Sequence, residues 1–344
     1  MSYLNPYSRL QTIHSAQEIL ELAQNRSYKL SMKSSLRLPR LERTRIREIA
    51  RVQEFAKQVK SRLRDAVEGF PTLEKLHPFY YELTDLIVGV DKLKQALGAV
   101  YNSTRPIENI ADRHIAQLKT ATDIREMKRA RRAAKGRISS IVRATAGNLD
   151  LMIEARRVLV RLPGVNTTIP TIVCAGFPNV GKSTLVRAVS TAEPEIAYYP
   201  FTTKEVIVGH LTVGNQTIQI VDTPGILDRP MSQRNEIEKK AIAAVKYLAN
   251  VILFMLDASE TCGWTFEEQM NLYSEVKRSF PLTPTVIVLN KVDITPSDHL
   301  AVARAKLPGA FEIVASSGTG VAELMQEALS EVDLEESTPT SSPD

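Results

Sequence analysis

The sequence has few cysteines, no long apolar run and little glycine or proline. Its two cysteines, Cys174 and Cys262, are too few for a disulfide framework and lack the spacing of metal ligands. No apolar run approaches the ~18 residues that cross a bilayer, and residues 1–10 lack the apolar segment of a signal peptide. With 15 Gly and 18 Pro in 344 residues, collagen-like and low-complexity classes are excluded. These absences predict a soluble, cytoplasmic, globular protein with no membrane attachment.

Charge is divided unevenly along the chain. The net charge is +5, but residues 1–165 hold 31 basic against 17 acidic residues, and the remainder holds 13 against 22. At ~100–200 residues per domain, length and charge together predict a basic domain over 1–165 and a second domain over 166–335. The polar segment 336–344 is expected to be a disordered tail. The basic domain is a candidate to bind a polyanion, although a solvated basic surface would give the same count.

The first domain shows helical periodicity throughout. Apolar residues recur at steps of three and four over 46–63 and 79–100, which predicts helices packed nearly parallel to one another. A further helix is expected to begin near Pro106, because proline suits a first helical turn. Asp123 and Glu126 predict the N-terminal cap of a long helix that runs toward Leu162. The sequence therefore predicts a helical bundle.

The densest basic run lies on that last helix, over 125–137. It contains seven basic residues against one acid, with Arg129, Arg131 and Arg132 at its centre. Such a ridge favours phosphate contact, because guanidinium groups match phosphate oxygens in pairs. A solvated helix face is the alternative.

The second domain alternates short β-rich runs with helical segments. The runs predict strands over 171–175, 206–213, 217–221, 251–256, 285–289 and 311–314. Gly214-Asn215 predicts a hairpin turn, and hence one antiparallel pair in an otherwise parallel sheet. The fold class is a helical bundle followed by an α/β domain with a mostly parallel sheet.

A phosphate-binding loop follows the first strand, over Gly176–Ser183, with the sequence GFPNVGKS. The two glycines let successive backbone N–H groups face phosphates. Lys182 supplies a charge to the terminal phosphates, and the hydroxyl of Ser183 is expected to bind Mg²⁺. The residues expected to contact the nucleotide here are Gly176, Pro178, Asn179, Val180, Gly181, Lys182, Ser183 and Thr184.

Three further motifs follow in the order that a GTPase requires. Asp222 ends the third predicted strand and is expected to hold a Mg²⁺-bound water, while the Gly225 N–H senses the last phosphate. In the polar loop 197–204, the Thr203 hydroxyl is expected to reach Mg²⁺ when a γ-phosphate is present.

The last motif is Asn290-Lys291-Val292-Asp293. The carboxylate of Asp293 can accept hydrogen bonds from N1–H and the 2-amino group of guanine, which adenine cannot offer. Four motifs in this order predict the binding of GTP or GDP with Mg²⁺.

Together with the segment 199–203, these motifs resemble the Obg-related branch of translation-factor GTPases. The segments 45–52, 76–80, 88–94 and 136–141 resemble the helical N-domain of the nucleolar GTP-binding protein 1 family. The resemblance covers about 10–330, and the end of the chain soon afterwards is typical of the short archaeal form. It implies a GTPase acting in assembly of the large ribosomal subunit, with precursor rRNA and ribosomal proteins as partners, and we expect a monomer in solution.

Two positions depart from common GTPase patterns. Val314-Ala315 stands where this branch usually carries Ser-Ala, so the Ala315 amide, with Ser316 beside it, is expected to meet guanine O6 with modest affinity. Ile226 stands where many GTPases place a water-orienting Gln, so intrinsic hydrolysis should be slow. In related GTPases an Asn in the position of Asn179 coordinates K⁺, which would replace the missing group. The alternatives are a small residue tolerated in the loop, or a stimulating group supplied by the ribosome.

We therefore expect a GTP-hydrolysing switch whose catalytic residues are Lys182, Thr203, Gly225 and Asn179. Ser183, Thr203 and Asp222 would serve Mg²⁺, and Asn179 would serve K⁺. Two alternatives stay open. One is a nucleotide-gated RNA-binding assembly module with negligible hydrolysis. The other is a GTPase partner in RNA modification, disfavoured by the N-domain and by the lack of a C-terminal Cys motif.

Overall fold

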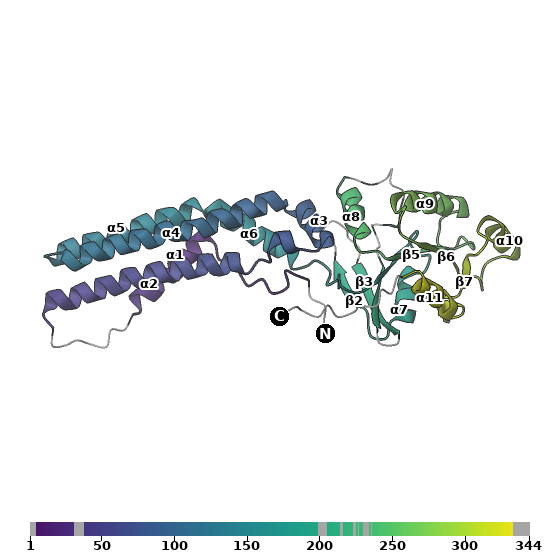
Figure 1. Cartoon of the computed structure of the whole chain (residues 1–344), viewed down its shortest axis with the longest axis horizontal. Coiled ribbons are helices and arrows are strands. Elements are labelled where there is room, and N and C mark those ends of the chain that lie inside the picture. Colours follow the sequence, from purple (N-terminus) through teal and green to yellow (C-terminus); the bar gives the residue numbers. More distant parts are fainter. Residues whose placement is uncertain are drawn as a thin grey trace, which may run out of the picture. The chain divides into compact units, whose positions relative to one another are not determined.

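The computed structural model describes residues 5–30, 38–198, 205–213, 216–222, 225, 227–229, 234 and 236–332. The chain divides into two compact units, which are drawn in Figure 1. The helical unit comprises 6–76 and 87–160, and the sheet unit comprises Asn5, 77–86 and the chain from 161 onward. The division is therefore discontinuous in sequence and differs from the single boundary predicted at residue 165.

Five α-helices and a short 3₁₀ turn (Leu73–Lys75) make up the described part of the helical unit. The α-helices are α1 (Ala16–Tyr28), α2 (Arg40–Glu68), α4 (Val90–Thr120), α5 (Ile124–Ala144) and α6 (Ala146–Leu159). Helix α2 packs against α1, α4 and α5, and α4 packs against α5 and α6. Apolar residues at helical spacing, such as Val59 and Leu63 on α2 and Leu93 and Val100 on α4, are fully buried between them. The predicted bundle is confirmed.

Three helix boundaries were predicted wrongly. The segment 79–100 is not one helix, because Gly89 adopts φ +84°, a left-handed conformation that ends α3 and begins α4. Pro106 begins no helix and lies inside α4, where the fully buried Val100 and Ile107 keep the helix packed on both sides of it. The helix from Asp123 stops at Thr145 and restarts as α6.

Helix α1 and strand β2 were not predicted from the sequence. Helix α1 begins at a capping box, in which the Ser15 hydroxyl accepts from Glu18 N and the Glu18 carboxylate accepts from Ser15 N. Strand β2 (Glu195–Tyr198) pairs antiparallel with β3. The Asp123 cap was predicted correctly, since its carboxylate accepts from Glu126 N at 2.8 Å.

The sheet unit is built on a seven-stranded sheet with the order β2-β3-β4-β1-β5-β6-β7. Its other strands are β1 (Thr171–Ala175), β3 (Glu205–Val213), β4 (Gln216–Asp222), β5 (Val251–Leu256), β6 (Thr285–Asn290) and β7 (Phe311–Ile313). Strands β4, β1, β5, β6 and β7 are parallel, and β3 pairs antiparallel with β4 as predicted. The predicted turn at 214–215 lies outside the described residues.

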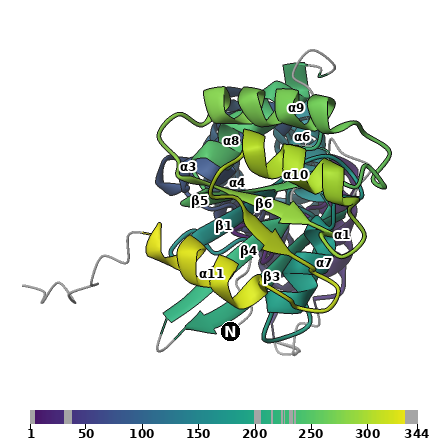
Figure 2. The ribbon, with the colours of Figure 1, turned by 90° about the vertical axis from the view of Figure 1, so that its right-hand side faces the viewer.

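Helices cover both faces of this sheet, as Figure 2 shows. Helices α8 (Glu236–Lys246), α9 (Phe266–Ser279) and α10 (Ser297–Lys306) lie on one side, and α7 (Lys182–Val189) and α11 (Val321–Ser330) lie on the other. The central strands β1 and β5 are completely buried, as continuous apolar runs in a doubly covered sheet should be. In this arrangement the carboxyl ends of β1, β4, β5 and β6 meet at one edge.

The segment 162–171 enters the sheet unit through buried polar contacts. Helix α3 (Pro78–Ile87) supplies Tyr80, whose hydroxyl lies 2.8 Å from the carbonyl oxygen of Pro163 and accepts from Val165 N at 3.0 Å. Gln219 of β4 accepts from Asn166 N at 3.1 Å and donates to Asn166 O at 2.8 Å. Because Tyr80 and Gln219 are buried, these contacts hold the segment firmly against α3 and β4.

Among the described residues, every helix is either too short or too polar to span a lipid bilayer.

Candidate functional site

The loop between β1 and α7 has the geometry of a phosphate-binding loop. Gly176 has φ +131°, and a Cβ there would lie 2.3 Å from the carbonyl oxygen of Met255. Gly181 has φ +104°, and a Cβ there would lie 2.1 Å from the side-chain nitrogen of Asn290. Both positions therefore require glycine, for conformation and for close approach. Pro178 is half-buried, Val180 is buried, and Asn179 is exposed with φ +64°.

Lys182 begins α7 and is 6% exposed. Its ammonium group donates to the carbonyl oxygens of Gly176 and Phe177, both at 2.9 Å. The charge is therefore held inside the curve of its own loop, next to the N-terminus of α7, where backbone N–H groups favour an anion. Thr184, in the first turn of the helix, is exposed.

Asp222 and Ser183 form the second part of the site. The Ser183 hydroxyl donates to Asp222 Oδ2 at 2.5 Å, and Asp222 is 1% exposed. Burial raises the pKa of Asp222 above its ordinary value, although the charge of Lys182 and the bond from Ser183 oppose that rise. Its other oxygen, Oδ1, has no hydrogen-bond partner among the described residues. A buried, unpaired carboxylate oxygen beside a serine hydroxyl is a donor set that suits Mg²⁺.

Asn290 joins three loops. Its side-chain nitrogen donates to the carbonyl oxygen of Val180 at 2.8 Å, and its side-chain oxygen accepts from the Ala315 N–H at 2.9 Å. These bonds tie the phosphate loop to the ends of β6 and β7. Because the Ala315 amide is engaged by Asn290, it is not free to meet a guanine O6 in this arrangement. The adjacent Ser316 is exposed.

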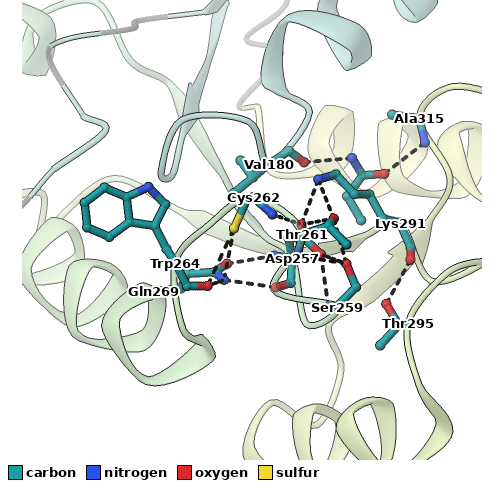
Figure 3. A network of polar contacts seen from close by, with 11 residues as sticks. Val180, Asp257, Ser259, Thr261, Cys262, Trp264, Gln269, Lys291, Thr295 and Ala315 are labelled. Carbon is teal, nitrogen blue, oxygen red and sulfur yellow. Dashed lines mark hydrogen bonds and ion pairs between the residues drawn. The ribbon is translucent and has the colours of Figure 1, made fainter.

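Lys291 and Asp293 extend from the end of β6. Lys291 has φ +62°, and its ammonium group donates to Asp257 Oδ2 at 2.7 Å and to Thr261 Oγ1 at 3.1 Å. Figure 3 shows these contacts at close range. The Asp293 side chain is exposed, so its carboxylate is open to a ligand.

Asp257, which was not predicted as a site residue, follows β5 directly and is 0% exposed. An aspartate immediately after the apolar run 251–256 was a usable signal, because the carboxyl end of a parallel strand is where α/β sheets bind ligands. Gln269, also missed, accepts from Asp257 N at 2.7 Å and donates to Asp257 O at 2.9 Å.

Trp264 lies against the phosphate loop. Its ring stacks on that of Phe177 in the phosphate loop, with centroids 4.4 Å apart and planes 26° apart. Its carbonyl oxygen accepts from Gln269 at 3.0 Å. The loop after β5 therefore contacts both the phosphate loop and the end of β6.

Thr203, with its segment 199–204, and Ile226 lie outside the described residues. Gly225 is described, buried and in a left-handed conformation with φ +85°. The structure thus brings together Gly176, Gly181, Lys182, Ser183, Asp222 and Asn290.

The basic run on α5 separates into five exposed residues and two half-buried ones, Arg131 and Lys135. Arg125, Lys128, Arg129, Arg132 and Arg137 are exposed. Arg131 instead lies 2.5 Å from the carboxylate of Glu48, which is 1% exposed, and donates to the Tyr28 hydroxyl at 2.9 Å. The predicted ridge therefore has a partly buried central member, which pairs inside the helical unit.

Comparison with known proteins agrees with the motifs. The family model described as the NOG1 N-terminal helical domain matches residues 7–166, and the model for nucleolar GTP-binding protein 1 matches 236–293. The chain belongs to the nucleolar GTP-binding protein 1 family. The predicted family and fold class are confirmed.

The relatives differ in length. Protein MJ1408 of Methanocaldococcus jannaschii is 37% identical over 86% of this chain and 83% of its own. Nucleolar GTP-binding protein 1 of Drosophila melanogaster is 38% identical over 69% of this chain and 36% of its own. The Saccharomyces cerevisiae protein of that name is 32% identical over 86% of this chain and 46% of its own. The chain thus spans less than half the length of these eukaryotic relatives.

Proposed function

We propose that this protein binds GTP and hydrolyses it to GDP and phosphate, as a switch in assembly of the large ribosomal subunit. The observation that carries the proposal is the convergence of Lys182, Asp222 and Asn290 around one loop at the carboxyl edge of the sheet. The names of the relatives, which call them GTP-binding, support it.

Each residue has a defined task in this proposal. Lys182 exchanges its two carbonyl partners for β- and γ-phosphate oxygens, which carry full charge and bind more strongly. Ser183 and Asp222 hold Mg²⁺, which when bound neutralises charge on the phosphates. Asp293, which is exposed just after the end of β6, accepts the two donors of guanine. The γ-phosphate would order Thr203 and Gly225, and hydrolysis would release these two residues.

Asn179 supports the proposal that K⁺ stimulates hydrolysis. Its side chain is exposed at the bend of the phosphate loop. The sequence places an aliphatic residue, Ile226, where many GTPases carry Gln. Because Ile226 cannot act as that Gln does, a cation beside the phosphates would supply the missing stabilisation of the transition state.

The partner proposed for the helical unit is rRNA of the large-subunit precursor, together with ribosomal proteins. The exposed arginines and lysines of α5 support this, because a helix carrying a row of exposed cations suits phosphate oxygens. The rival function is an RNA-binding module with negligible hydrolysis. It would use the same basic surface of α5 and would differ only in its turnover of GTP.

The deciding experiment measures GTP turnover with and without purified large ribosomal subunits, in K⁺ and in Na⁺. The proposal expects a slow basal rate that subunits or K⁺ increase, and nucleotide binding that Lys182→Ala abolishes. Tight binding without turnover under all conditions would favour the rival. Retained affinity in Lys182→Ala would overturn the assignment of the phosphate loop.

A further inference from the structure

The carboxylate of Asp257 lies at the centre of a network beside the proposed guanine site. It is 0% exposed and accepts hydrogen bonds at both oxygens (Figure 3). Oδ1 accepts from Ser259 N at 3.0 Å and from the Ser259 hydroxyl at 2.5 Å. Oδ2 accepts from Cys262 N and Thr261 Oγ1, both at 3.0 Å, and from Lys291 at 2.7 Å. The carboxylate is therefore fully saturated, and one of its partners is a cation.

Four of these bonds fold the loop 257–262 locally, but the bond to Lys291 does not. The backbone of Asp257 is already fixed by Gln269, a 1% exposed side chain that bonds to both its N–H and its carbonyl oxygen. Gln269 also donates to the carbonyl oxygen of Trp264, so the loop is held at both ends. The contact with Lys291 joins this loop to a different strand, 34 residues further along the chain.

Lys291 is placed between two residues of the proposed site. Asn290 before it clamps the phosphate loop through Val180, and Asp293 after it offers the exposed carboxylate for guanine. A lysine side chain that is free in solution loses considerable rotamer freedom when a ligand packs against it. Here the ammonium group is already held by Asp257 and Thr261, so that freedom has been lost before any nucleotide arrives.

We propose that Asp257 is a positioning residue for nucleotide binding, which holds Lys291 so that its methylene stem forms a fixed wall of the guanine site. This role rests on the proposed function. It assigns to Asp257 no contact with the nucleotide. The residue acts by restricting Lys291 and by keeping its charge neutralised within the protein.

The test compares Asp257→Asn, Lys291→Met and the double variant with the wild-type chain. Asp298→Asn on α10 is the matched control, because that carboxylate is exposed. The dissociation constants of GDP and GTP should both rise by about 10- to 30-fold in Asp257→Asn, which corresponds to the rotamer entropy of one lysine. KM should rise while kcat stays constant, because the wall contributes equally in the ground and transition states. The double variant should be no worse than the worse single variant.

A second readout does not need nucleotide. Acylation of lysines in the free protein, measured by mass spectrometry, should modify Lys291 slowly in the wild type and faster in Asp257→Asn. If Asp257→Asn fails to fold, Lys291→Arg serves instead, because an arginine can still pair with Asp257 and should retain most of the affinity that Lys291→Met loses.

Several results would overturn the role of Asp257. These are unchanged affinity in Asp257→Asn, additive losses in the double variant, parallel loss of kcat and thermal stability, or equal acylation of Lys291 in both proteins. A wild-type protein that binds no guanine nucleotide would instead overturn the proposed function and remove the role with it. The two failures are distinguishable because the wild type is measured first.

Discussion

The side chain of Gln219 makes two hydrogen bonds to the main chain of Asn166, accepting from its N–H and donating to its carbonyl oxygen. Gln219 is 0% exposed and lies on β4, three residues before Asp222. The same nitrogen also donates to the Thr171 hydroxyl at 2.6 Å. One buried amide thus attaches the segment that follows α6 to the strand that leads into the Mg²⁺ site.

Replacing Gln219 by Leu should destabilise the sheet unit by about 2–4 kcal/mol, because Asn166 N and O would be left buried without partners. Denaturant unfolding followed by circular dichroism measures this. Gln216→Leu is the matched control, since Gln216 begins the same strand but is exposed, and its effect should stay within about 0.5 kcal/mol. Equal effects of the two substitutions would contradict the importance of the Asn166 contact.

Asp293→Asn should weaken GDP binding by about 10- to 100-fold and improve binding of xanthine nucleotides, because the new amide can donate to the C2 carbonyl of xanthine. The carboxylate is exposed, so the fold should be unaffected. Competition titrations with GDP and XDP measure the change. A variant that still prefers guanine would show that Asp293 does not contact the base.

The exposed arginines of α5 should carry RNA affinity, whereas Arg131 should carry stability. Reversing Arg125, Arg129 and Arg132 to Glu should weaken rRNA binding and lower the slope of log affinity against log salt by about 2. Electrophoretic mobility shifts at several salt concentrations measure both. Arg131→Glu should instead destabilise the helical unit, because it would face the buried Glu48.

A control for these reversals needs the same change in charge elsewhere. Lysines on α8, α9 and α10 provide it, and all three are exposed: Lys246, Lys277 and Lys306. If reversing these lysines weakens rRNA binding as much as reversing the α5 arginines, the effect is one of net charge, and α5 is a solvated face.

Hydrolysis should be at least about tenfold faster in K⁺ than in Na⁺ at equal ionic strength, if a cation at Asn179 supplies part of the stabilisation of an arginine finger. Single-turnover assays measure the rates. Asn179→Ala should remove the difference and leave GTP affinity nearly intact. Because Asn179 has φ +64°, Asn179→Gly is the cleaner variant, since glycine adopts this conformation without strain. Equal wild-type rates in both salts would assign the stimulating group to the ribosome.

The fluorescence of Trp264 should change when nucleotide binds, because the chain has one tryptophan and its ring stacks on Phe177 of the phosphate loop. Trp264→Ala should weaken GDP binding by up to about tenfold, a factor that corresponds to the interaction energy of one aromatic pair. Trp264→Phe should keep the affinity and lose the signal. An emission spectrum that GDP leaves unchanged would argue that the stack does not respond to the loop.

The sequence was most informative where one residue type is required by chemistry or by backbone conformation. The order of the motifs along the chain predicted that their residues meet around the phosphate loop, at one edge of the sheet. The structure places five of them there: Gly176, Gly181, Lys182, Asp222 and Asn290. The family and fold class followed from these motifs and from the helical periodicity.

Where prediction failed, distant contacts decided the outcome. Pro106 favours a helix start locally, but packing of its neighbours keeps α4 continuous. Arg131 resembles the other arginines of α5 in sequence. What distinguishes it is its contact in space with Glu48, a residue 83 positions earlier in the chain. Likewise, no local pattern shows that Asp257 pairs with Lys291 or that the Ala315 amide bonds to Asn290.

The placement of α3 limits how this protein can be divided. In the sequence, residues 77–86 lie between α2 and α4, two long helices of the helical unit, yet they belong to the sheet unit. A fragment that ends at residue 160 would carry Tyr80 without the carbonyl and amide groups that it binds at Pro163 and Val165. A fragment that begins at residue 161 would lack the same helix. Truncations and chimaeras of this chain therefore have to keep α3 together with the residues from 161 onward, because no single cut yields two complete units.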